Sequence, residues 1–163
     1  VIFSCFHSKQ QLSYLYERGD DLFNRHKYWR AALFFEQCIS LEPDHLNAHF
    51  KLGSSYLYLG RHEEAIRELK LVTDVDPLAY QAYTSLGDVY YNTERFDLAA
   101  EAYRKAISIK PDYLMAIESL AMLYPSGGVT REEAIELWEK ALKLETRDEW
   151  IERAKHYLET LKK

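Results

Sequence analysis

Apolar residues recur three and four positions apart through most of the chain, which is the periodicity of a helix with one buried face. One such run contains Leu52, Tyr56 and Leu59, and another begins at Ala65 and continues through Leu69. Each regular unit is therefore predicted to be a helix, a tight turn and a second helix. Polar or glycine-containing stretches mark the turns at residues 24–27, 59–61 and 92–95.

The pattern returns with a period of 34 residues, which is the signature of a repeat architecture. The columns that share this period are Pro43, Pro77 and Pro111; Ala31, Ala65 and Ala99; Gly19, Gly53 and Gly87; Phe35, Leu69 and Tyr103; and Leu22, Tyr56 and Tyr90. Because proline lacks an N–H and disfavours helix in the preceding residue, each proline is predicted to follow the end of a second helix. Glycine inside a helix costs about 1 kcal/mol relative to alanine, so the glycine column predicts close approach of the paired helix, with the alanine column opposite.

This pattern resembles the tetratricopeptide repeat. The resemblance is carried by His49-x-x-Leu52-Gly53-x-x-Tyr56 and Tyr83-x-x-Leu86-Gly87-x-x-Tyr90, together with the alanine, large-residue and proline columns. It covers residues 12–145 and implies an all-α fold, a right-handed superhelical solenoid of antiparallel helix pairs. We predict a single domain over residues 1–163, with repeats at about 12–45, 46–79, 80–113 and 114–147 and a capping helix at about 148–161.

The fourth unit diverges from the period, because Ala134 lies 35 residues after Ala99. The extra residue falls in the breaker run at 125–128 and is predicted to shorten the first helix of this unit. Thr130 and Glu133 have the spacing of a capping box that starts the second helix, and Trp138 stands in the large-residue column.

The two ends of the chain carry their own helix signals. Trp150, Ala154, Tyr157, Leu158 and Leu161 form one apolar face and are predicted to cap the end of the stack. Ser8 and Gln11 predict that the first helix begins near Lys9.

Composition limits the classes of function. The 26 acidic and 21 basic side chains give a net charge of −5, the wrong sign for attraction to a phosphate backbone, so we expect no nucleic-acid partner. No stretch approaches the ~20 consecutive apolar residues of a membrane-spanning helix. Cys5 and Cys38 do not form a disulfide framework, and Cys38 occupies a small-residue packing position. We expect a cytoplasmic protein.

The N-terminal run Val1–Cys5 lacks an initiator methionine and is interpreted as a trimmed end. The alternative is a lipoprotein cleavage box, although Phe3 is bulky where such boxes prefer a small residue. Under this alternative the protein would be lipid-anchored or periplasmic.

By resemblance, the first helices of the repeats line a concave groove that binds extended peptides or partner helices. Carrying this over residue by residue places in the groove Tyr16, Asp20, Phe23 and Asn24; Asn47, Phe50, Ser54, Leu57 and Tyr58; Gln81, Thr84, Asp88, Tyr91 and Asn92; and Met115, Glu118 and Met122. Rings and apolar groups would anchor a ligand, and amides would pair with its backbone. The alternative for Phe23, Leu57 and Tyr58 is packing between neighbouring units.

The charge of these residues predicts a class of ligand. Asp20, Asp88 and Glu118 favour an apolar or basic protein or peptide rather than an acidic chaperone tail. The family's two-carboxylate clamp needs lysines, asparagines and an arginine, but its places hold Tyr16, Asp20, Lys51, Gln81 and Ser85. Shifting the comparison by one unit gives Phe50, Ser54, Ser85, Met115 and Ser119. Chaperone co-factor activity is therefore not predicted.

Residues that could carry chemistry are better explained by structure. His45 lies in an inter-repeat link and His49 in a packing column, which argues against a metal pair. The pairs Glu63-Glu64 and Glu132-Glu133 stand at helix starts, where the helix dipole favours negative charge. Gly127-Gly128 lacks the lysine and serine of a phosphate loop. We predict no catalytic residue, no metal and no cofactor.

The leading hypothesis is a non-enzymatic scaffold that holds a peptide segment or partner helix in the groove. The alternative is a structural or self-associating assembly module, which could be a membrane-tethered lipoprotein assembly factor. An enzyme built on the solenoid is a third hypothesis, since fold alone does not forbid it.

Overall fold

The computed structural model describes the backbone of residues 2–163 and the side chains of residues 9–163. The trimming and lipidation hypotheses for Val1–Cys5 concern residues outside this description. The chain forms two compact units, which meet in the sequence at Pro77 and Leu78. Each unit is described separately. Over the described residues the structure consists of α-helices and one short 3₁₀ helix, so the prediction of an all-α fold is confirmed.

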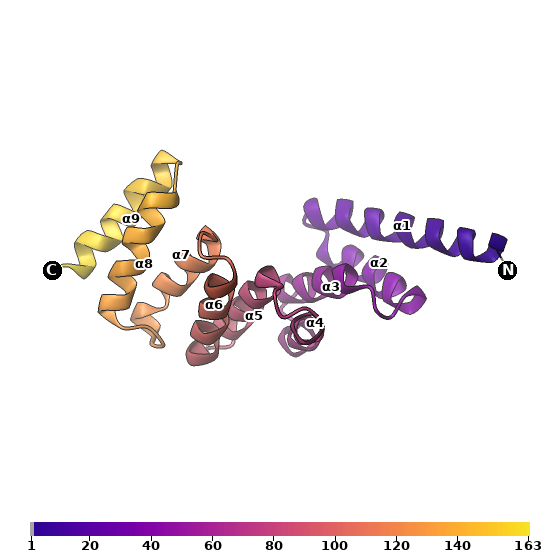
Figure 1. The fold of residues 1–163 in the computed structure, drawn as a ribbon, viewed down its shortest axis with the longest axis horizontal. Helices are drawn as coiled ribbons and strands as arrows, with labels where there is room; N and C mark the ends of the chain where they lie inside the picture. Colours follow the sequence, from indigo (N-terminus) through magenta and orange to yellow (C-terminus); the bar gives the residue numbers. More distant parts are fainter. Residues whose placement is uncertain (1) are drawn as a thin grey trace. The chain divides into compact units, whose positions relative to one another are not determined.

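The N-terminal unit contains two helical hairpins (Figure 1). They are built from α1 (Ile2–Asn24), α2 (Tyr28–Leu41), α3 (Leu46–Tyr58) and α4 (His62–Val75). Helix α1 packs on α2, α3 packs on α4, and α2 joins the two hairpins by packing on α3. These are the predicted antiparallel helix pairs.

The C-terminal unit continues the pattern and ends with an additional helix (Figure 1). Its elements are α5 (Tyr80–Asn92), α6 (Phe96–Ile109), α7 (Leu114–Met122), the 3₁₀ helix η1 (Tyr124–Ser126), α8 (Arg131–Leu144) and α9 (Asp148–Leu161). Helix α5 packs on α6, α6 on α7, α7 on α8, and α8 on α9.

The glycine column marks the places where paired helices lie closest together. A Cβ atom added at Gly19 would lie 2.8 Å from Cε1 of Phe35, and one at Gly53 would lie 2.8 Å from Cγ of Leu69. The predicted close approach is confirmed. The partner is different from the one expected, because the facing atoms belong to the large-residue column. The alanine column is fully buried and does not face the glycines.

The prolines and paired glutamates lie at the boundaries of the helices, as predicted. Pro43 stands two residues after the end of α2, and Pro77 and Pro111 follow α4 and α6 at the same distance. Both glutamate pairs lie in the first turn of a helix, one in α4 and one in α8.

The turns inside the three regular hairpins share a backbone conformation. His26, Gly60 and Glu94 stand 34 residues apart and have φ values of 57°, 72° and 58°. Only one of these left-handed positions is a glycine. The hairpin packing therefore holds the other two residues in a conformation that side chains rarely adopt.

The divergent fourth unit has the predicted short first helix. Helix α7 has 9 residues, whereas α3 and α5 each have 13. The chain then passes through η1 and through Gly127, whose φ is 103°. The side chain of Thr130 accepts a hydrogen bond from the backbone N–H of Glu133, which confirms the predicted start of α8. Arg104 holds this segment by donating to Glu133 and to the carbonyl of Gly128.

The last helix covers α8 with the predicted apolar face. Ala154, Leu158 and Leu161 are buried, and Tyr157 stacks on Trp138 at 4.8 Å between ring centroids. The Arg131 Nε donates to the Leu161 carbonyl, which ties the start of α8 to the end of α9.

The first helix begins earlier than predicted. Helix α1 starts at Ile2, so Ser8 lies inside the helix and not at its start. The physical reason is that residues 2–8 contain neither proline nor glycine, and a capping-box spacing is ineffective where the helix continues through it.

Candidate protein-binding surface

An aromatic cluster lies on the predicted groove face of the N-terminal unit. Tyr58 from the end of α3 is 60% exposed, yet its ring stacks on Tyr28 at 4.3 Å. Phe23 from α1 meets both rings edge-on, at 5.3 Å from Tyr28 and 5.9 Å from Tyr58. The Nζ of Lys51 lies 4.9 Å from the centroid of Phe23. Rings from three helices thus form one surface cluster.

Tyr28 was missed by the sequence analysis because it opens a second helix, and only first helices were assigned to the groove. The repeat period could have identified this position, because an aromatic residue recurs there. Phe96 stands two periods later at the start of α6, and its ring meets Tyr91 at 5.8 Å. The first residue of the second helix therefore supports the groove ring in both units.

The polar groove residues of α1 are already engaged within the unit. Asp20 forms an ion pair with Lys51 at 2.5 Å and accepts a hydrogen bond from Asn24 at 3.1 Å. Tyr16 packs on His45 with ring centroids 5.2 Å apart, and burial raises the pKa of its hydroxyl. The negative charge predicted for this part of the groove is largely balanced.

Ser54 and Thr84 are not part of the accessible surface, which corrects their assignment as contact residues. Their exposed fractions are 6% and 3%, and each hydroxyl donates to a carbonyl four residues earlier in its own helix. A small hydroxyl side chain can satisfy itself in this way while packed. Phe50 and Leu57 are half-buried, and Asn47 is exposed.

The C-terminal unit places Gln81, Tyr91, Asn92 and Met115 on its surface. Asp88 is half-buried between α5 and α6, where it accepts a hydrogen bond from the Tyr103 hydroxyl at 2.7 Å. Burial raises the pKa of Asp88 to about 6, although this hydrogen bond opposes the shift. Its carboxylate is therefore a weaker source of negative charge than the sequence suggested.

Glu118 and Met122, on α7, lie beside arginines that the groove assignment did not include. Burial, and then Glu145, raise the pKa of Glu118, while Arg147 and Arg153 act in the opposite direction. Arg153 also approaches the Met122 sulfur, at 4.0 Å from its Nη2. Only folding could reveal these neighbours, because they come from the segment that follows α8.

The two histidines considered as metal ligands have structural partners. The His45 Nδ1 accepts from the backbone N–H of Ala48 and caps α3. His49 is buried between Glu68, at 2.6 Å from its Nδ1, and the carbonyl of Pro43, at 2.8 Å from its Nε2. Both rings are committed to holding the link between α2 and α3.

Comparison with known proteins identifies the repeat. The sequence profile described as Tetratricopeptide repeat matches residues 16–70 and again residues 50–113, together more than half of the chain. The chain belongs to the tetratricopeptide repeat family. Within this family the described helical hairpins serve protein interaction, and such proteins are generally non-enzymatic scaffolds.

Three proteins illustrate what this tetratricopeptide repeat chain is similar to. The structure of MamA residues 41 to the end from Desulfovibrio magneticus RS-1 is 27% identical and has a TM-score of 0.73, covering 82% of this chain and 75% of that one. Protein O-mannosyl-transferase TMTC3 of Mus musculus is 28% identical over an alignment of 158 residues that covers 86% of this chain and 17% of TMTC3. The first tetratricopeptide domain of RPAP3, bound to the HSP90 peptide SRMEEVD, is 19% identical with a TM-score of 0.68, covering 72% of this chain and 93% of that one, and shows the fold alone.

The chain spans between 12 and 29% of the length of the first curated relatives it matches. These matches therefore concern the repeat segment and not the activity of the whole relative. Among the described helices of the present chain, none is long and apolar enough to cross a membrane.

Proposed function

We propose that this protein is a non-enzymatic scaffold that holds a peptide segment or a partner helix against the first helices of its repeats. The observation that carries the proposal is the cluster of Phe23, Tyr28 and Tyr58. It combines a largely exposed ring with two supporting rings, and the exposed amide side chain of Asn24 directly follows Phe23 in the chain. Aromatic anchors next to hydrogen-bonding side chains are the usual features of a peptide-binding surface.

The cluster is ordered before any ligand arrives. Tyr58 lies almost parallel to Tyr28, with 12° between the ring planes. A ring that is already held in place loses little conformational freedom on binding, so more of its contact energy contributes to affinity. This supports a role in recognition as well as in packing.

We propose an apolar ligand with few charges, and with basic rather than acidic side chains where it has any. Lys51 is committed to Asp20, and Glu118 adds an acidic group on the C-terminal unit. The acidic HSP90 peptide SRMEEVD found with RPAP3 is therefore expected to bind weakly here, because the places of the two-carboxylate clamp hold other residues.

The proposal is tested by substituting the exposed ring. Partners captured from a native lysate would be identified, and a peptide from the captured protein would be titrated against wild type and Tyr58→Ala. We expect Kd to rise about tenfold or more, as for a buried aromatic anchor.

The matched control is Tyr14→Ala, since Tyr14 is 62% exposed on α1 and was not assigned to the groove. Circular dichroism would confirm equal helix content. If Tyr14→Ala and Tyr58→Ala weaken binding equally, the groove assignment is wrong.

Self-association is a second candidate function, and α2 supplies the observation that favours it. Trp29 and Leu33 are 56% and 48% exposed and lie one turn apart on α2, where they form a short exposed apolar stripe. Such a stripe can pack against another chain. Sedimentation velocity across a hundredfold concentration range would reveal association, and Leu33→Glu is expected to abolish it.

A further inference from the structure

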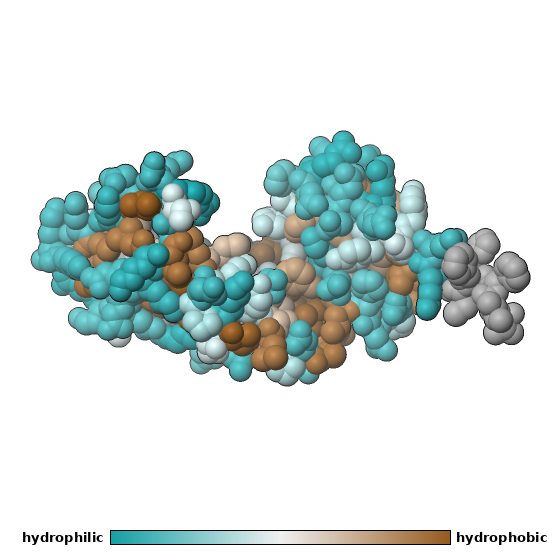
Figure 2. Space-filling view, turned by 45° about the horizontal axis from the view of Figure 1, so that its top comes forward, coloured by the Kyte–Doolittle hydropathy of each residue, from teal (hydrophilic) through white to brown (hydrophobic). Residues whose placement is uncertain are grey.

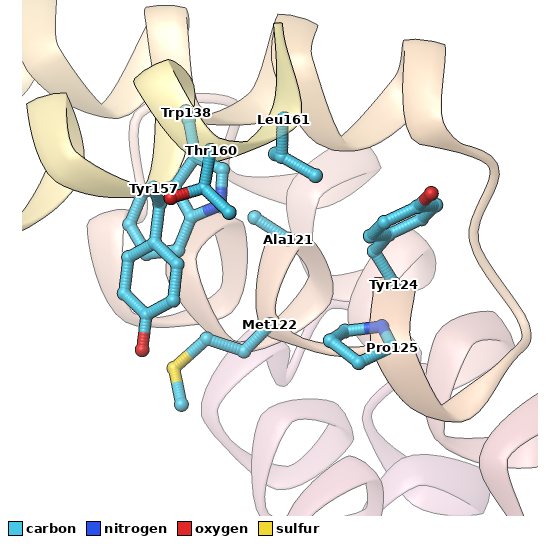
Figure 3. A pocket seen from close by; sticks show the side chains of 8 residues that line it. All are labelled: Ala121, Met122, Tyr124, Pro125, Trp138, Tyr157, Thr160 and Leu161. Atoms are coloured by element: carbon cyan, nitrogen blue, oxygen red, sulfur yellow. The ribbon is translucent and has the colours of Figure 1, made fainter. Parts of the chain in front are cut away.

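An apolar pocket lies at the far end of the C-terminal unit, away from the aromatic cluster in sequence. Its volume is about 230 Å³. Helices α7, α8 and α9 and the 3₁₀ helix η1 contribute its lining side chains (Figure 3), which are Ala121, Met122, Tyr124, Pro125, Trp138, Tyr157, Thr160 and Leu161. Figure 2 shows apolar residues gathered on the surface of this unit between hydrophilic stretches.

The pocket exists because the fourth repeat is irregular. Helix α7 ends at Met122, and η1 then carries Tyr124 and Pro125 outward as the opposite wall. In the same unit Trp138 and Tyr157 stack with 8° between their planes, which makes a rigid floor. The walls are therefore held by the fold and do not depend on a ligand.

The size of the pocket selects what can occupy it. Apolar cavities of about 150 Å³ hold a benzene molecule, so this one accommodates an aromatic ring or a large aliphatic side chain. It is smaller than the range of about 300–1,000 Å³ typical of cofactor and drug-sized ligand sites. A single anchoring side chain fits better than a cofactor.

One polar group inside the pocket lacks a partner. Trp138 is only 2% exposed, and among the described residues its indole N–H donates no hydrogen bond. Figure 3 shows the nitrogen edge of this ring on the side of Thr160 and Ala121, which also line the pocket. The indole nitrogen is accessible and not fully buried, so a carbonyl oxygen of an occupant can accept a hydrogen bond from it.

A cation stands at the margin of the pocket. The Arg153 guanidinium lies 5.8 Å from the Tyr157 ring and 4.0 Å from the Met122 sulfur, and both of these residues line the pocket. Within the described part of the chain Arg153 forms no ion pair, although Glu118 is near enough to feel its charge. Its neighbour Arg147 is bound to Glu145. Arg153 is thus the cation open to an incoming acidic group.

We propose that this pocket binds a segment of a partner protein that contains a large apolar residue next to an acidic one. The apolar side chain fills the pocket, a backbone carbonyl accepts the hydrogen bond from Trp138, and the acidic side chain meets Arg153. The site is independent of the groove in the N-terminal unit. The pocket therefore favours a ligand segment with an acidic side chain, whereas the predicted groove favours one with basic side chains.

The experiment follows the three tryptophan indole signals in a nitrogen–proton NMR spectrum, with Trp138→Phe identifying the signal of Trp138. The probe is the capped peptide acetyl-Gly-Asp-Phe-Gly-amide. We expect a saturable shift of the Trp138 signal. Replacing Phe in the peptide by Ala should weaken binding at least about tenfold, and replacing Asp by Lys about two- to fivefold.

Two variants of the protein locate the contacts. Thr160→Phe should fill the pocket from an exposed position on α9 and abolish the shift. Arg153→Gln should weaken binding of the Asp peptide about two- to fivefold without changing that of the Lys peptide. Lys155→Gln on the same helix is the matched control, because Lys155 pairs with Glu152, is exposed and does not line this pocket. It should leave both affinities unchanged.

Several outcomes would overturn the proposal. These are no shift of the Trp138 signal, equal shifts with the Phe and Ala peptides, or no effect of Arg153→Gln. A shift that grows with protein concentration alone would assign the pocket to a second copy of the chain. Tighter binding of decanoate than of the peptide would assign it to an acyl chain. Tyr58→Ala should not change any of these results, which separates this test from that of the groove.

Discussion

Asp20 and Asp88 occupy the same position of their repeats, two periods apart, but the two units treat them differently. In the N-terminal unit the residue facing this position from the second helix is Phe35, which cannot donate a hydrogen bond. Lys51 from the next hairpin supplies a positive charge instead, 2.5 Å from the Asp20 carboxylate. The pair is half-buried, with side-chain exposures of 22% for the lysine and 34% for the aspartate.

In the C-terminal unit Phe35 is replaced by Tyr103 and Lys51 by Ser119, each 68 residues further along the chain. Asp88 accepts a hydrogen bond from the Tyr103 hydroxyl and has no cation beside it among the described residues. Its pKa is raised to about 6. The two aspartates thus have the same place in the helix hairpin but different electrostatic environments. The difference comes from the side chains that neighbouring helices place beside each carboxylate.

The largest expected effect comes from removing the buried charge by Asp88→Asn. The pKa of Asp88 rises from 3.8 to about 6 on folding, so the folded state binds this proton more tightly than the unfolded state. The stabilisation from this group is present below pH 4 and is lost as the pH rises through 6. The variant, which cannot ionise, should exceed wild type in unfolding free energy by up to about 3 kcal/mol at pH 7.5 and differ little at pH 4.

Urea unfolding at the two pH values measures this difference. Asp112→Asn, at an exposed site in the same unit, is the control and should change neither value. A wild-type protein that gains stability relative to Asp88→Asn between pH 4 and pH 7.5 would show that Asp88 is stabilised as the anion.

A smaller effect is expected from Tyr103→Phe, which copies the aromatic residue of the first repeat into the third. The ring stays in contact with Gly87, but Asp88 loses its hydrogen-bond donor. Leaving a buried charged group unsatisfied should cost about 2 kcal/mol at pH 7.5, and about 1 kcal/mol when the carboxyl is protonated at pH 4.

Tyr113→Phe is a suitable control for Tyr103→Phe. Its hydroxyl donates to the Met115 sulfur at a half-exposed site, so the loss should stay below about 0.5 kcal/mol. If the two variants lose equal unfolding free energy, the hydrogen bond to Asp88 does not contribute more to stability than an ordinary surface contact.

The smallest effect is expected from Lys51→Ser, which copies the residue of the fourth repeat into the second. The ion pair to Asp20 is partly open to solvent, so its loss should cost about 0.5 kcal/mol, and less in 1 M salt. Lys70→Ser, at an exposed site on α4, provides the baseline. A loss above about 2 kcal/mol would show that Lys51 holds the two hairpins together more strongly than a surface pair can.

The fold was predictable to the level of helix pairs because its signals are local and repeated. The glycine, large-residue and proline columns placed three hairpins correctly, and the single extra residue near 125–128 predicted the short α7. The start of α1 was wrong, since a capping pattern is also compatible with the interior of a helix.

The candidate surface was predictable only in part. The periodicity places Tyr58 and Tyr91 outward, and both are exposed. It places Ser54 and Thr84 outward as well, but they are small enough to be covered by neighbours and to bond to their own helices. Spacing along one helix carries no information about the size of the side chains that arrive from other helices.

The sequence by itself determined that this chain is a tetratricopeptide repeat with a divergent last unit, because helix propensity, periodicity and punctuation act within a few residues of each other. Only the tertiary structure decided that Asp20 meets a cation while Asp88 meets a hydroxyl, and that Arg153 borders a pocket floored by Trp138. Those properties depend on side chains brought together from separate helices. Electrostatic energies and packing depend on distances of a few ångströms, which the order of residues alone does not specify.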